Sequence, residues 1–433
     1  MRLSGWGRYP CIDADLIEPT TLSAARESLA ELASLAPRGL GRSYGDSALA
    51  EKIVGTRQLR HLRSFDESSG VLDCDAGISL GELLNLFVPR GWFLPVTPGT
   101  KFVSIGGAIA SDVHGKNHHL HGCFSECVDS IEIMLADGQL TRCSRTEQPD
   151  LFHATCGGMG LTGLIVGARL RLRRIESAYI TQTTHKAANL DEVVALFDSH
   201  GSATYSVAWI DCLASGKALG RSLLMLGEHA SDGELSLSPK PTLSIPLDMP
   251  STLLNRYSVQ AFNELYYRRI RQTESQQRVG YESFFYPLDS IRQWNRLYGK
   301  RGFLQYQFVI PKAAGLEGMR AILQRIAASR RGSFLAVLKA FGAANDNLLS
   351  FPVEGYTLAL DFKYETNLLE LLSELDAMVL AYGGRLYLSK DARMSEATFK
   401  HSYPHWTRFQ ETRARYGALH KFASLQSRRL GLD

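Results

Sequence analysis

Residues 96–121, with the sequence VTPGTKFVSIGGAIASDVHGKNHHLH, place small residues beside side chains that can do chemistry. The small residues that leave the backbone nearly bare are Gly99, Gly106, Gly107, Ala108, Ala110 and Gly115. The polar groups beside them are Asp112, His114, Lys116, His118, His119 and His121. Inward-turned N–H groups of such a segment can bind an anion such as a pyrophosphate. The stretch indicates either an anion cradle or a tightly packed core turn.

Two more glycine-rich segments lie before and after this stretch. Residues 38–46 read RGLGRSYGD, and residues 156–163 read CGGMGLTG. A single glycine motif is weak support for a binding site. Three such turns together can supply the several N–H donors that a dianionic pyrophosphate needs, so their joint occurrence favours the cradle.

A metal site is the rival interpretation of the histidine-rich run. His118, His119 and His121 are spaced closely enough to bind zinc. Neighbouring side chains of an extended segment point in opposite directions, so one ion could not easily collect all three. The seven cysteines contain no CxxC pair, although Cys123 and Cys127 are four residues apart. We therefore expect no metal and reduced thiols.

Composition sets the broad class of the protein. A chain of 433 residues predicts about two to three domains. Its net charge of +4 includes no long basic run, so nucleic acid is not indicated. Residues 1–15 lack the apolar core of a signal peptide, and no run of about eighteen apolar residues occurs. A cytoplasmic location is the expectation.

The elements that must position the first half follow from periodicity and capping. A helix over residues 22–35 begins at Thr20 or Thr21 and stops before Pro37. A strand is predicted over residues 71–76, followed by a helix that the capping box of residues 79–82 starts. Residues 128–135 and 139–143 flank Asp137-Gly138, which is typical of a β-hairpin with a primed turn. The alternating arginines of residues 164–173 predict a half-solvated strand.

The residue pattern of the sequence changes after Glu176, and we place a domain boundary near Ser177. Strands are predicted over residues 179–184, 204–211 and 221–226, with a helix capped at Asn189. The serine- and proline-rich residues 231–250 predict a mobile loop or lid. Beyond it, three arginines on a predicted helix form a solvated face or a phosphate contact: Arg268, Arg269 and Arg271.

Two later strands carry polar side chains on one face. Alternation over residues 302–310 puts Gln305 and Gln307 together, where they could orient a polyol or a flat heterocycle or simply face water. Residues 334–341 place Lys339 on an apolar face, either at a strand end or aimed into a pocket. Further strands over residues 356–362 and 385–390 flank a helix over residues 368–380, and helices follow Ser395.

Five motifs carry a family resemblance: RGLGRSYGD, GGAIASDVHGKNHH, GGMGLTG, GFLQYQF and GGRLYLSKDAR. They resemble the vanillyl-alcohol-oxidase class of flavoproteins, which has a PCMH-type FAD fold. Within it they are most similar to members that oxidise a polyprenylphosphoryl ribose. The resemblance implies an α+β fold with an FAD-binding domain at 1–176, an antiparallel-sheet substrate domain at 177–386 and a returning segment at 387–433.

The resemblance also implies the residues that contact the cofactor. These are Gly39, Leu40, Gly41, Arg42, Ser43, Tyr44, Gly45, Gly99, Ser104, Ile105, Gly106, Gly107, Ser111, His114, Ile165 and Tyr387. Many relatives bind the flavin covalently through a histidine of the first loop, where this chain carries Tyr44. A phenol is not the usual partner for that linkage, so we expect non-covalent FAD.

The implied reaction is FAD-dependent oxidation of the ribose 2-hydroxyl of a polyprenylphosphoryl-β-D-ribose to a ketone. Lys390 would act as a base or stabilise negative charge on the reduced ring. The other residues expected to support catalysis are Tyr387, Gln305, Gln307, Lys339, Lys116 and His114. Two alternatives are a soluble alditol or aldonolactone oxidase and a non-catalytic flavin-binding scaffold.

The implied partners are a lipid-linked sugar phosphate and a short-chain NAD(P)H reductase that would complete an epimerisation. A lipid-linked substrate would bring the protein to the inner face of the membrane. The loop of residues 231–250 would then cover the prenyl phosphate.

Overall fold

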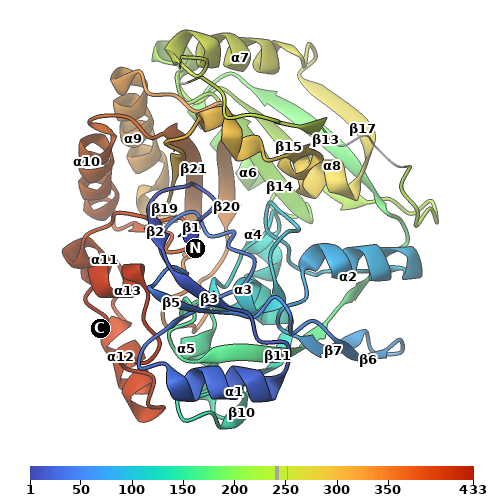
Figure 1. Ribbon diagram of the computed structural model, residues 1–433. Helices are drawn as coiled ribbons and strands as arrows, with labels where there is room; N and C mark the ends of the chain where they lie inside the picture. The colour runs from blue at the N-terminus through green and yellow to red at the C-terminus, as the bar shows by residue number, and fades with distance from the viewer. Residues whose placement is uncertain (239–242, 251) are drawn as a thin grey trace.

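Two antiparallel sheets organise the computed structural model, which describes residues 1–238, 243–250 and 252–433 (Figure 1). The smaller sheet has the strand order β10 (Leu140–Cys143), β9 (Val128–Met134), β11 (Leu164–Arg171), β7 (Val71–Asp75) and β6 (Leu62–Asp66). The larger has the order β17 (Glu274–Gly280), β13 (Tyr179–Ala187), β15 (Ser222–His229), β14 (Tyr205–Ile210), β20 (Ala336–Phe341), β21 (Gly355–Lys363), β19 (Phe303–Pro311) and β22 (Arg385–Leu386). Helices and a large antiparallel sheet in one chain confirm the expected α+β class.

The N-terminal part adds a parallel sheet of β3 (Asp15–Ile17), β5 (Lys52–Gly55) and β4 (Ala36–Arg38), beside the hairpin of β1 (Arg2–Ser4) and β2 (Cys11–Asp13). Helix α1 (Leu22–Glu31) begins where expected, because the Thr21 hydroxyl accepts a hydrogen bond from the Ala24 amide. It ends earlier than predicted, since Pro37 lies within β4. The capping box of α2 (Leu80–Phe87) is confirmed at Ser79.

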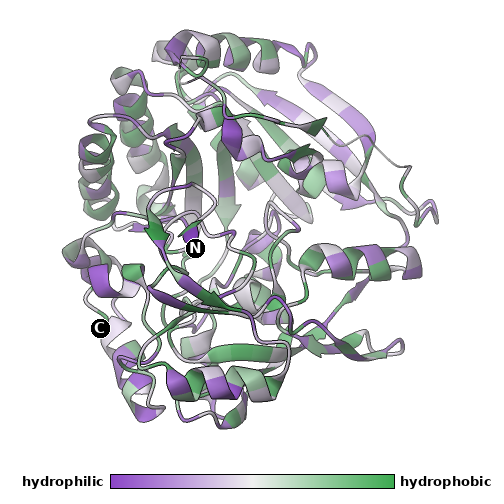
Figure 2. Ribbon diagram, in the orientation of Figure 1, coloured by the Kyte–Doolittle hydropathy of each residue, from purple (hydrophilic) through white to green (hydrophobic). Residues whose placement is uncertain are grey.

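Helices cover one face of the larger sheet. Helices α6 (Leu190–Ser199), α9 (Gly315–Ser329) and α10 (Leu368–Ala381) share a core with the apolar side chains of β19 and β21. Figure 2 shows that the strands beside α9 and α10 are largely hydrophobic. Leu304, Tyr306 and Phe308 lie in this core, which confirms the predicted alternation along β19. Gln305 and Gln307 lie on the opposite face of β19.

Short elements connect the strands of the smaller sheet. Between β7 and β9 lie β8 (Trp92–Phe93), α3 (Ile105–Ala110) and α4 (His118–His121), and between β10 and β11 lies α5 (Pro149–Thr155). Strand β12 (Arg173–Arg174) then leads from the smaller sheet to the larger one. The predicted boundary near Ser177 falls between β12 and β13. We therefore propose the division into units at 1–176, 177–386 and 387–433.

The C-terminal helices pack back against the N-terminal part of the chain. They are α11 (Glu396–Ser402), α12 (Trp406–Arg415) and α13 (Leu425–Arg429), in red beside the blue strands of Figure 1. Arg429 forms ion pairs with Asp46 and Asp391, each at 2.7–2.8 Å. This contact fixes the end of the first glycine-rich loop to the segment that follows β22.

Three further sequence expectations need correction. The hairpin turn is not primed, because Gly138 has a positive φ and Asp137 does not. The Gly138 amide donates to the Leu135 carbonyl at 3.0 Å, which is typical of a three-residue loop. The strand predicted over residues 385–390 stops at Leu386, so Lys390 lies in a turn. His118 to His121 form the short helix α4 rather than an extended segment.

The loop or lid predicted over residues 231–250 stays a prediction, and part of it, residues 239–242, lies outside the described residues. Of the described part, β16 (Leu243–Ser244) pairs with β18 (Ile291–Arg292). The arginine cluster that follows is spread over the end of α7 (Arg256–Arg268) and the turn beyond it. Arg268 pairs with Glu264, and the Arg269 guanidinium lies 3.8 Å from the centroid of the Tyr266 ring.

Asp112 connects the two halves of the protein. Its carboxylate is fully buried and follows α3. Four donors reach it at 2.7–3.1 Å, three of them from the loop between β20 and β21: Ser125 N, Asn345 Nδ2, Asn347 Nδ2 and Ser350 Oγ. A buried charge is tolerated only when hydrogen bonds satisfy it, so this network fixes the loop against α3.

Replacing Asp112 with alanine should lower the free energy of unfolding by about 3–5 kcal/mol, because four buried donors lose a charged acceptor. Urea unfolding of the purified protein measures this value. Asp346→Ala is the matched control, since Asp346 is exposed in the same loop, and it should cost less than about 0.5 kcal/mol. Equal losses for the two variants would contradict the role given to Asp112.

Candidate active site

The first glycine-rich loop carries unpaired amide groups. Within the described chain, no backbone or side-chain acceptor is hydrogen-bonded to the N–H of Leu40, Gly41, Arg42 or Ser43. Gly41 has a φ of 64°, a left-handed conformation that favours glycine. Successive free amides beside such a residue form a concave nest for an anion. The loop therefore fits the diphosphate of a dinucleotide cofactor.

Close approach explains the two glycines at the ends of this loop. A Cβ on Gly39 would lie 2.2 Å from Ser104 Oγ, and one on Gly45 would lie 1.7 Å from the Asp391 carbonyl oxygen. Neither position can hold a larger residue without moving its neighbour. The loop is thus held between α3 on one side and the segment after β22 on the other.

Several amides of the second and third glycine-rich segments already have acceptors within the protein. The amides of Ile105 and Gly106 donate to the Ile78 and Ala76 carbonyls at 2.8 Å, and the Gly107 amide donates to Ser104 Oγ. In the third segment, two amides donate to carbonyls of α3: Gly157 to Ile109 and Met159 to Ala110. These hydrogen bonds pack the two segments closely together, and their contacts with a cofactor stay predictions.

The polar face of the larger sheet forms the second side of the site. Gln307 is buried, and its Nε2 lies 3.0 Å from His114 Nε2 and 3.3 Å from Thr357 Oγ1. Gln305 Nε2 donates to Asp361 Oδ1 at 2.6 Å. The two amides that the sequence placed on one face are therefore fixed by partners from β21 and from the segment after α3.

His114 presents an unpaired ring nitrogen to the site. Burial, together with the charges of Lys339, His118 and Lys390, holds the pKa of His114 well below its usual value. The ring is neutral at pH 7, and Nδ1 is buried without a hydrogen-bond partner among the described residues. An unsatisfied buried donor or acceptor costs about 1–3 kcal/mol, so this nitrogen indicates a missing ligand.

The Tyr387 ring lies beside the His114 ring. Its ring stacks on Phe351 at 4.7 Å and lies 5.1 Å from the His114 ring. Its hydroxyl donates to the Ser111 carbonyl at 2.8 Å, and its amide donates to the Gln307 carbonyl at 3.0 Å. Burial raises the pKa of Tyr387, which keeps the phenol protonated.

Lys390 lies over the Tyr44 ring, with its Nζ 4.0 Å from the centroid. Burial lowers the pKa of Lys390 to about 7, and Lys339 acts in the same direction while Asp361 opposes it. Burial likewise raises the pKa of Asp361 to about 7. An amine with such a pKa can exchange a proton at neutral pH.

Two more lysines enter the same site. Burial lowers the pKa of Lys116 to about 7, with a further contribution from the charge of Lys339. Lys116 Nζ donates to the Phe284 carbonyl and lies 4.3 Å from the Phe284 ring centroid. Burial also lowers the pKa of Lys339 to about 8. The charge of Lys339 thus disfavours the protonation of the other two desolvated amines, and the cluster favours an anionic ligand.

The remaining predicted cofactor residues lie at the margins of this arrangement. Ile165 is buried in β11, and a Cβ on Gly106 would lie 3.6 Å from its Cβ. A Cβ on Gly99 would meet no atom within 4 Å, so this glycine borders open space. Arg42 lies 4.1 Å from the Trp6 ring centroid. Their contacts with a cofactor stay predictions.

Sequence reasoning missed Asp361, which links Gln305 to Lys390. Alternation along the strand predicted at residues 356–362 would have placed Asp361 on the face of Thr357 and Ala359.

No group of three His, Cys, Asp or Glu side chains that could hold a metal occurs among the described residues. In the same part of the chain, no helix is long and apolar enough to cross a membrane.

Comparison with known proteins places these features in context. A family model described as an FAD binding domain matches residues 16–144. The whole chain is 38% identical to decaprenylphosphoryl-beta-D-ribose oxidase of Mycolicibacterium smegmatis and covers 97% of it. Over 82% of its length it is 32% identical to an uncharacterized protein of Streptomyces coelicolor, which it covers completely. Over 37% it is 30% identical to a putative D-arabinono-1,4-lactone oxidase of Neurospora crassa, of which 29% is covered.

Replacing Lys339 with methionine should stabilise the flavin-free protein at pH 7 by about 1–3 kcal/mol. The pKa of Lys339 falls from 10.5 to about 8 on folding, so the charged native amine is penalised fully below pH 8. The penalty vanishes above pH 10.5, where the amine is neutral in both states. Urea unfolding across this range measures the difference.

Lys217→Met is the control, because Lys217 is exposed, and it should change stability little at any pH. A gain from Lys339→Met that stays constant between pH 7 and pH 10.5 would contradict the desolvation of Lys339.

Proposed function

Because the chain belongs to the family of decaprenylphosphoryl-β-D-ribose oxidase, whose members are FAD-binding oxidoreductases, we propose that it oxidises a lipid-linked sugar. The reaction converts the ribose 2-hydroxyl of a polyprenylphosphoryl-β-D-ribose to a ketone, in the synthesis of an arabinose donor. One observation carries this proposal: the side chains of Lys390, Gln305 and Gln307 gather around one small space. This group combines a titratable amine with two amides that can bind the hydroxyls of a polyol.

FAD, when bound, accepts the hydride that leaves the sugar carbon. The amides of residues 40–43 would hold its diphosphate, because they are free donors in a concave loop. The unpaired Nδ1 of His114 and the ring of Tyr387 lie where the same cofactor would continue. These residues bind and orient the cofactor while the buried rings around them exclude water.

Lys390 takes the proton of the sugar hydroxyl in this proposal. Its lowered pKa leaves a neutral amine available near pH 7. Gln305 donates a hydrogen bond to Asp361, whose charge acts on Lys390, and Gln307 is fixed by His114 and Thr357. The two amides therefore hold the sugar while Lys390 and Asp361 exchange its proton. Lys339 and Lys116 would add positive charge that stabilises a reduced, anionic flavin.

We propose that FAD is bound without a covalent link. Tyr44 stands where many relatives carry a flavin-linked histidine. Burial raises the pKa of Tyr44 well above 10, so the phenol stays protonated and is a poor nucleophile. Its ring instead supports Lys390 and contacts Phe303 edge-on at 5.6 Å.

A lipid-linked substrate requires contact with a membrane, and α7 offers a surface for it. Three apolar residues spaced four apart face outward on α7: Tyr257, Ala261 and Leu265. Tyr257 and Leu265 are 69% and 72% exposed, and Leu247 nearby is 73% exposed. Arg268 and Arg269 end the helix, whose outer side is partly hydrophobic in Figure 2. We propose that α7 lies on an anionic phospholipid surface at the inner face of the membrane.

A short-chain NAD(P)H reductase would complete the epimerisation by reducing the ketone on the opposite face of the sugar. This partner follows from the chemistry of the product. A ketone at the 2-position becomes an arabinose only when hydride returns to the other side of the ring.

The second candidate is an alditol or aldonolactone oxidase that acts on free polyols. It is favoured by the similarity to the putative D-arabinono-1,4-lactone oxidase, which is confined to about a third of the chain. Oxidation of free polyols without a lipid would support it. The third candidate is a non-catalytic flavin scaffold. It requires that no sugar reduces, and thereby bleaches, the bound flavin.

Lys390→Ala should slow the anaerobic bleaching of FAD by polyprenylphosphoryl ribose by about 10²–10⁴-fold, because the hydroxyl proton loses its acceptor. Stopped-flow absorbance of the FAD-loaded variant measures the rate. Acid precipitation should release the same amount of free FAD from the variant as from the native protein. Lys217→Ala is the control with an unchanged rate, and near-native bleaching by Lys390→Ala would refute the assignment.

Leu265→Glu should reduce sedimentation with vesicles of phosphatidylcholine and phosphatidylglycerol at least fivefold, because a charge enters the apolar stripe. Leu62→Glu is the matched control, since Leu62 is exposed on β6 of the other sheet. Raising the salt concentration should also weaken binding, as arginines contribute to it. Equal sedimentation of the two variants would exclude α7 as the membrane contact.

A further inference from the structure

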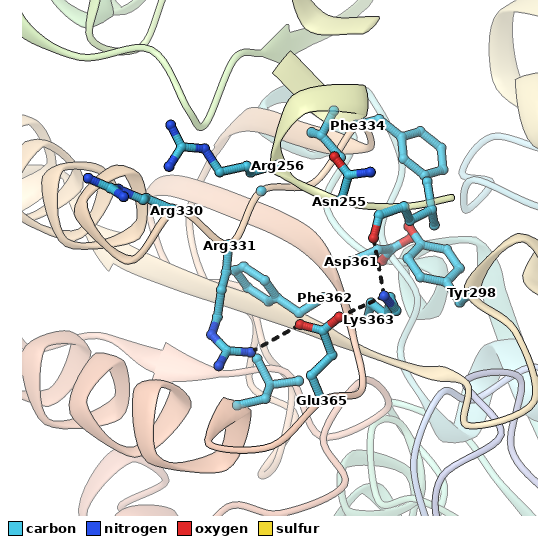
Figure 3. A pocket seen from close by; sticks show the side chains of 14 residues that line it. Asn255, Arg256, Tyr298, Arg330, Arg331, Phe334, Asp361, Phe362, Lys363 and Glu365 are labelled. Carbon is cyan, nitrogen blue, oxygen red and sulfur yellow. Dashed lines mark hydrogen bonds and ion pairs between the residues drawn. The ribbon is translucent and has the colours of Figure 1, made fainter. Parts of the chain in front are cut away.

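A second, larger cavity lies beyond Asp361, at the end of β20 and β21. Its volume is about 440 Å³, and its walls come from α7, β21 and the segment before β20. Figure 3 shows Arg256, Arg330 and Arg331 on one side of the cavity and Asp361 and Tyr298 on the other. None of these arginines has a role in the site described above.

Unpaired polar atoms gather around this cavity. Across the described residues, eight buried side-chain atoms lack a hydrogen-bond partner. Of these, three without an ion-pair partner belong to residues that line the cavity: Arg256 Nε, Tyr298 OH and Asp361 Oδ2. Tyr298 and Asp361 are 3% and 1% exposed. Each unpaired group costs about 1–3 kcal/mol, so three around one space indicate a ligand that completes their hydrogen bonds.

The charges of the lining select an anion. Four basic side chains face two acidic ones, Asp361 and Glu365. Glu365 is already paired, with Lys363 at 2.6 Å and with Arg331 at 3.5 Å. Burial keeps a proton on Asp361 up to about pH 7, so its carboxyl can donate a hydrogen bond to an anion. Arg256 and Arg331 line the cavity, and guanidinium groups bind phosphate oxygens in a planar geometry.

The cavity lies between Asp361, which contacts the catalytic face, and the α7 region. At its inner end, Asp361 Oδ1 accepts the hydrogen bond from Gln305 that positions this amide. At its outer end, Asn255, Arg256 and Val259 of the α7 region form the wall. Apolar side chains complete the lining: Leu254, Phe334, Phe362 and Leu368. A ligand here would meet an anion site with apolar walls beside it.

We propose that this cavity binds the phosphate of a prenyl-phosphate group, with Arg256 and Arg331 on the phosphate oxygens and Tyr298 as a neutral donor. The inference rests on the proposed function for the sugar that this phosphate carries. The phosphate of a polyprenylphosphoryl ribose is attached next to the carbon that is oxidised, so the two subsites must adjoin. The bridge from Asp361 to Gln305 supplies that adjacency.

Calorimetric titration of the FAD-loaded protein with farnesyl phosphate tests the cavity without requiring turnover. Arg256→Gln and Arg331→Gln should each weaken binding at least tenfold, because each removes a charged donor. Arg301→Gln is the matched control, since Arg301 is exposed and outside the lining, and it should change binding less than twofold. Inorganic phosphate should bind more weakly than farnesyl phosphate, because the apolar wall would be left without a partner.

Tyr298→Phe separates a binding role from a structural one. The hydroxyl has no partner in the described protein, so its removal should leave the melting temperature equal or higher. Binding of farnesyl phosphate should nevertheless weaken at least threefold. Native affinity in folded Tyr298→Phe, Arg256→Gln and Arg331→Gln would overturn the proposal. Stronger binding of inorganic phosphate than of farnesyl phosphate would also overturn it, in favour of a free phosphate site.

The proposed function can fail separately. Farnesyl phosphate could bind through the arginines while farnesylphosphoryl ribose fails to bleach the flavin. That result would support the prenyl-phosphate site and refute the sugar reaction. In detergent solution, where no membrane contributes, Arg331→Gln should raise the KM for farnesylphosphoryl ribose at least tenfold and leave kcat within about twofold. If Arg331→Gln instead lowers kcat and leaves KM unchanged, Arg331 does not contact the phosphate.

Discussion

Desolvation of positive charge is the constraint on which the site depends. Lys116, Lys339 and Lys390 all lose hydration in one place, and the charge of Lys339 lowers the pKa of the other two. Asp361 opposes this effect at Lys390 only in part. A fold can hold such a cluster only if a ligand supplies negative charge or if the amines give up protons. A flavin dinucleotide that becomes anionic on reduction satisfies the first condition, and proton transfer at Lys390 uses the second.

The surrounding structure holds this unfavourable cluster in place. Asp112 fixes the loop between β20 and β21 against α3, and Arg429 fixes the first glycine-rich loop to the segment that carries Lys390. The larger sheet presents its glutamines from a rigid strand whose other face is buried under helices. Rigid elements on both sides let the site keep charged and unpaired groups that would otherwise relax into contact.

Local signals in the sequence predicted much of the fold and the shared face of Gln305 and Gln307. Side-chain oxygens at Thr21, Ser79 and Asn189 cap the helices as expected, because capping depends on residues three positions apart. Alternation along β19 fixed the face of the glutamines. The hydrogen-bond acceptors of the α3 amides could not be predicted. These acceptors, the carbonyls of Ala76 and Ile78, lie about thirty residues earlier and reach α3 only through tertiary packing. Lys390 stands in a turn for a similar reason, as β22 pairs with β19 at only two residues.

The reduction potential of the bound flavin tests the central claim most directly, because it measures how strongly the site favours negative charge on the reduced ring. A cluster of desolvated amines should make the two-electron potential of bound FAD more positive than that of free FAD by at least about 30 mV, or about 1.4 kcal/mol. Spectroelectrochemical titration at pH 7 gives this value. A potential equal to or below that of free FAD would show that the three lysines do not act on the flavin, and would contradict the account.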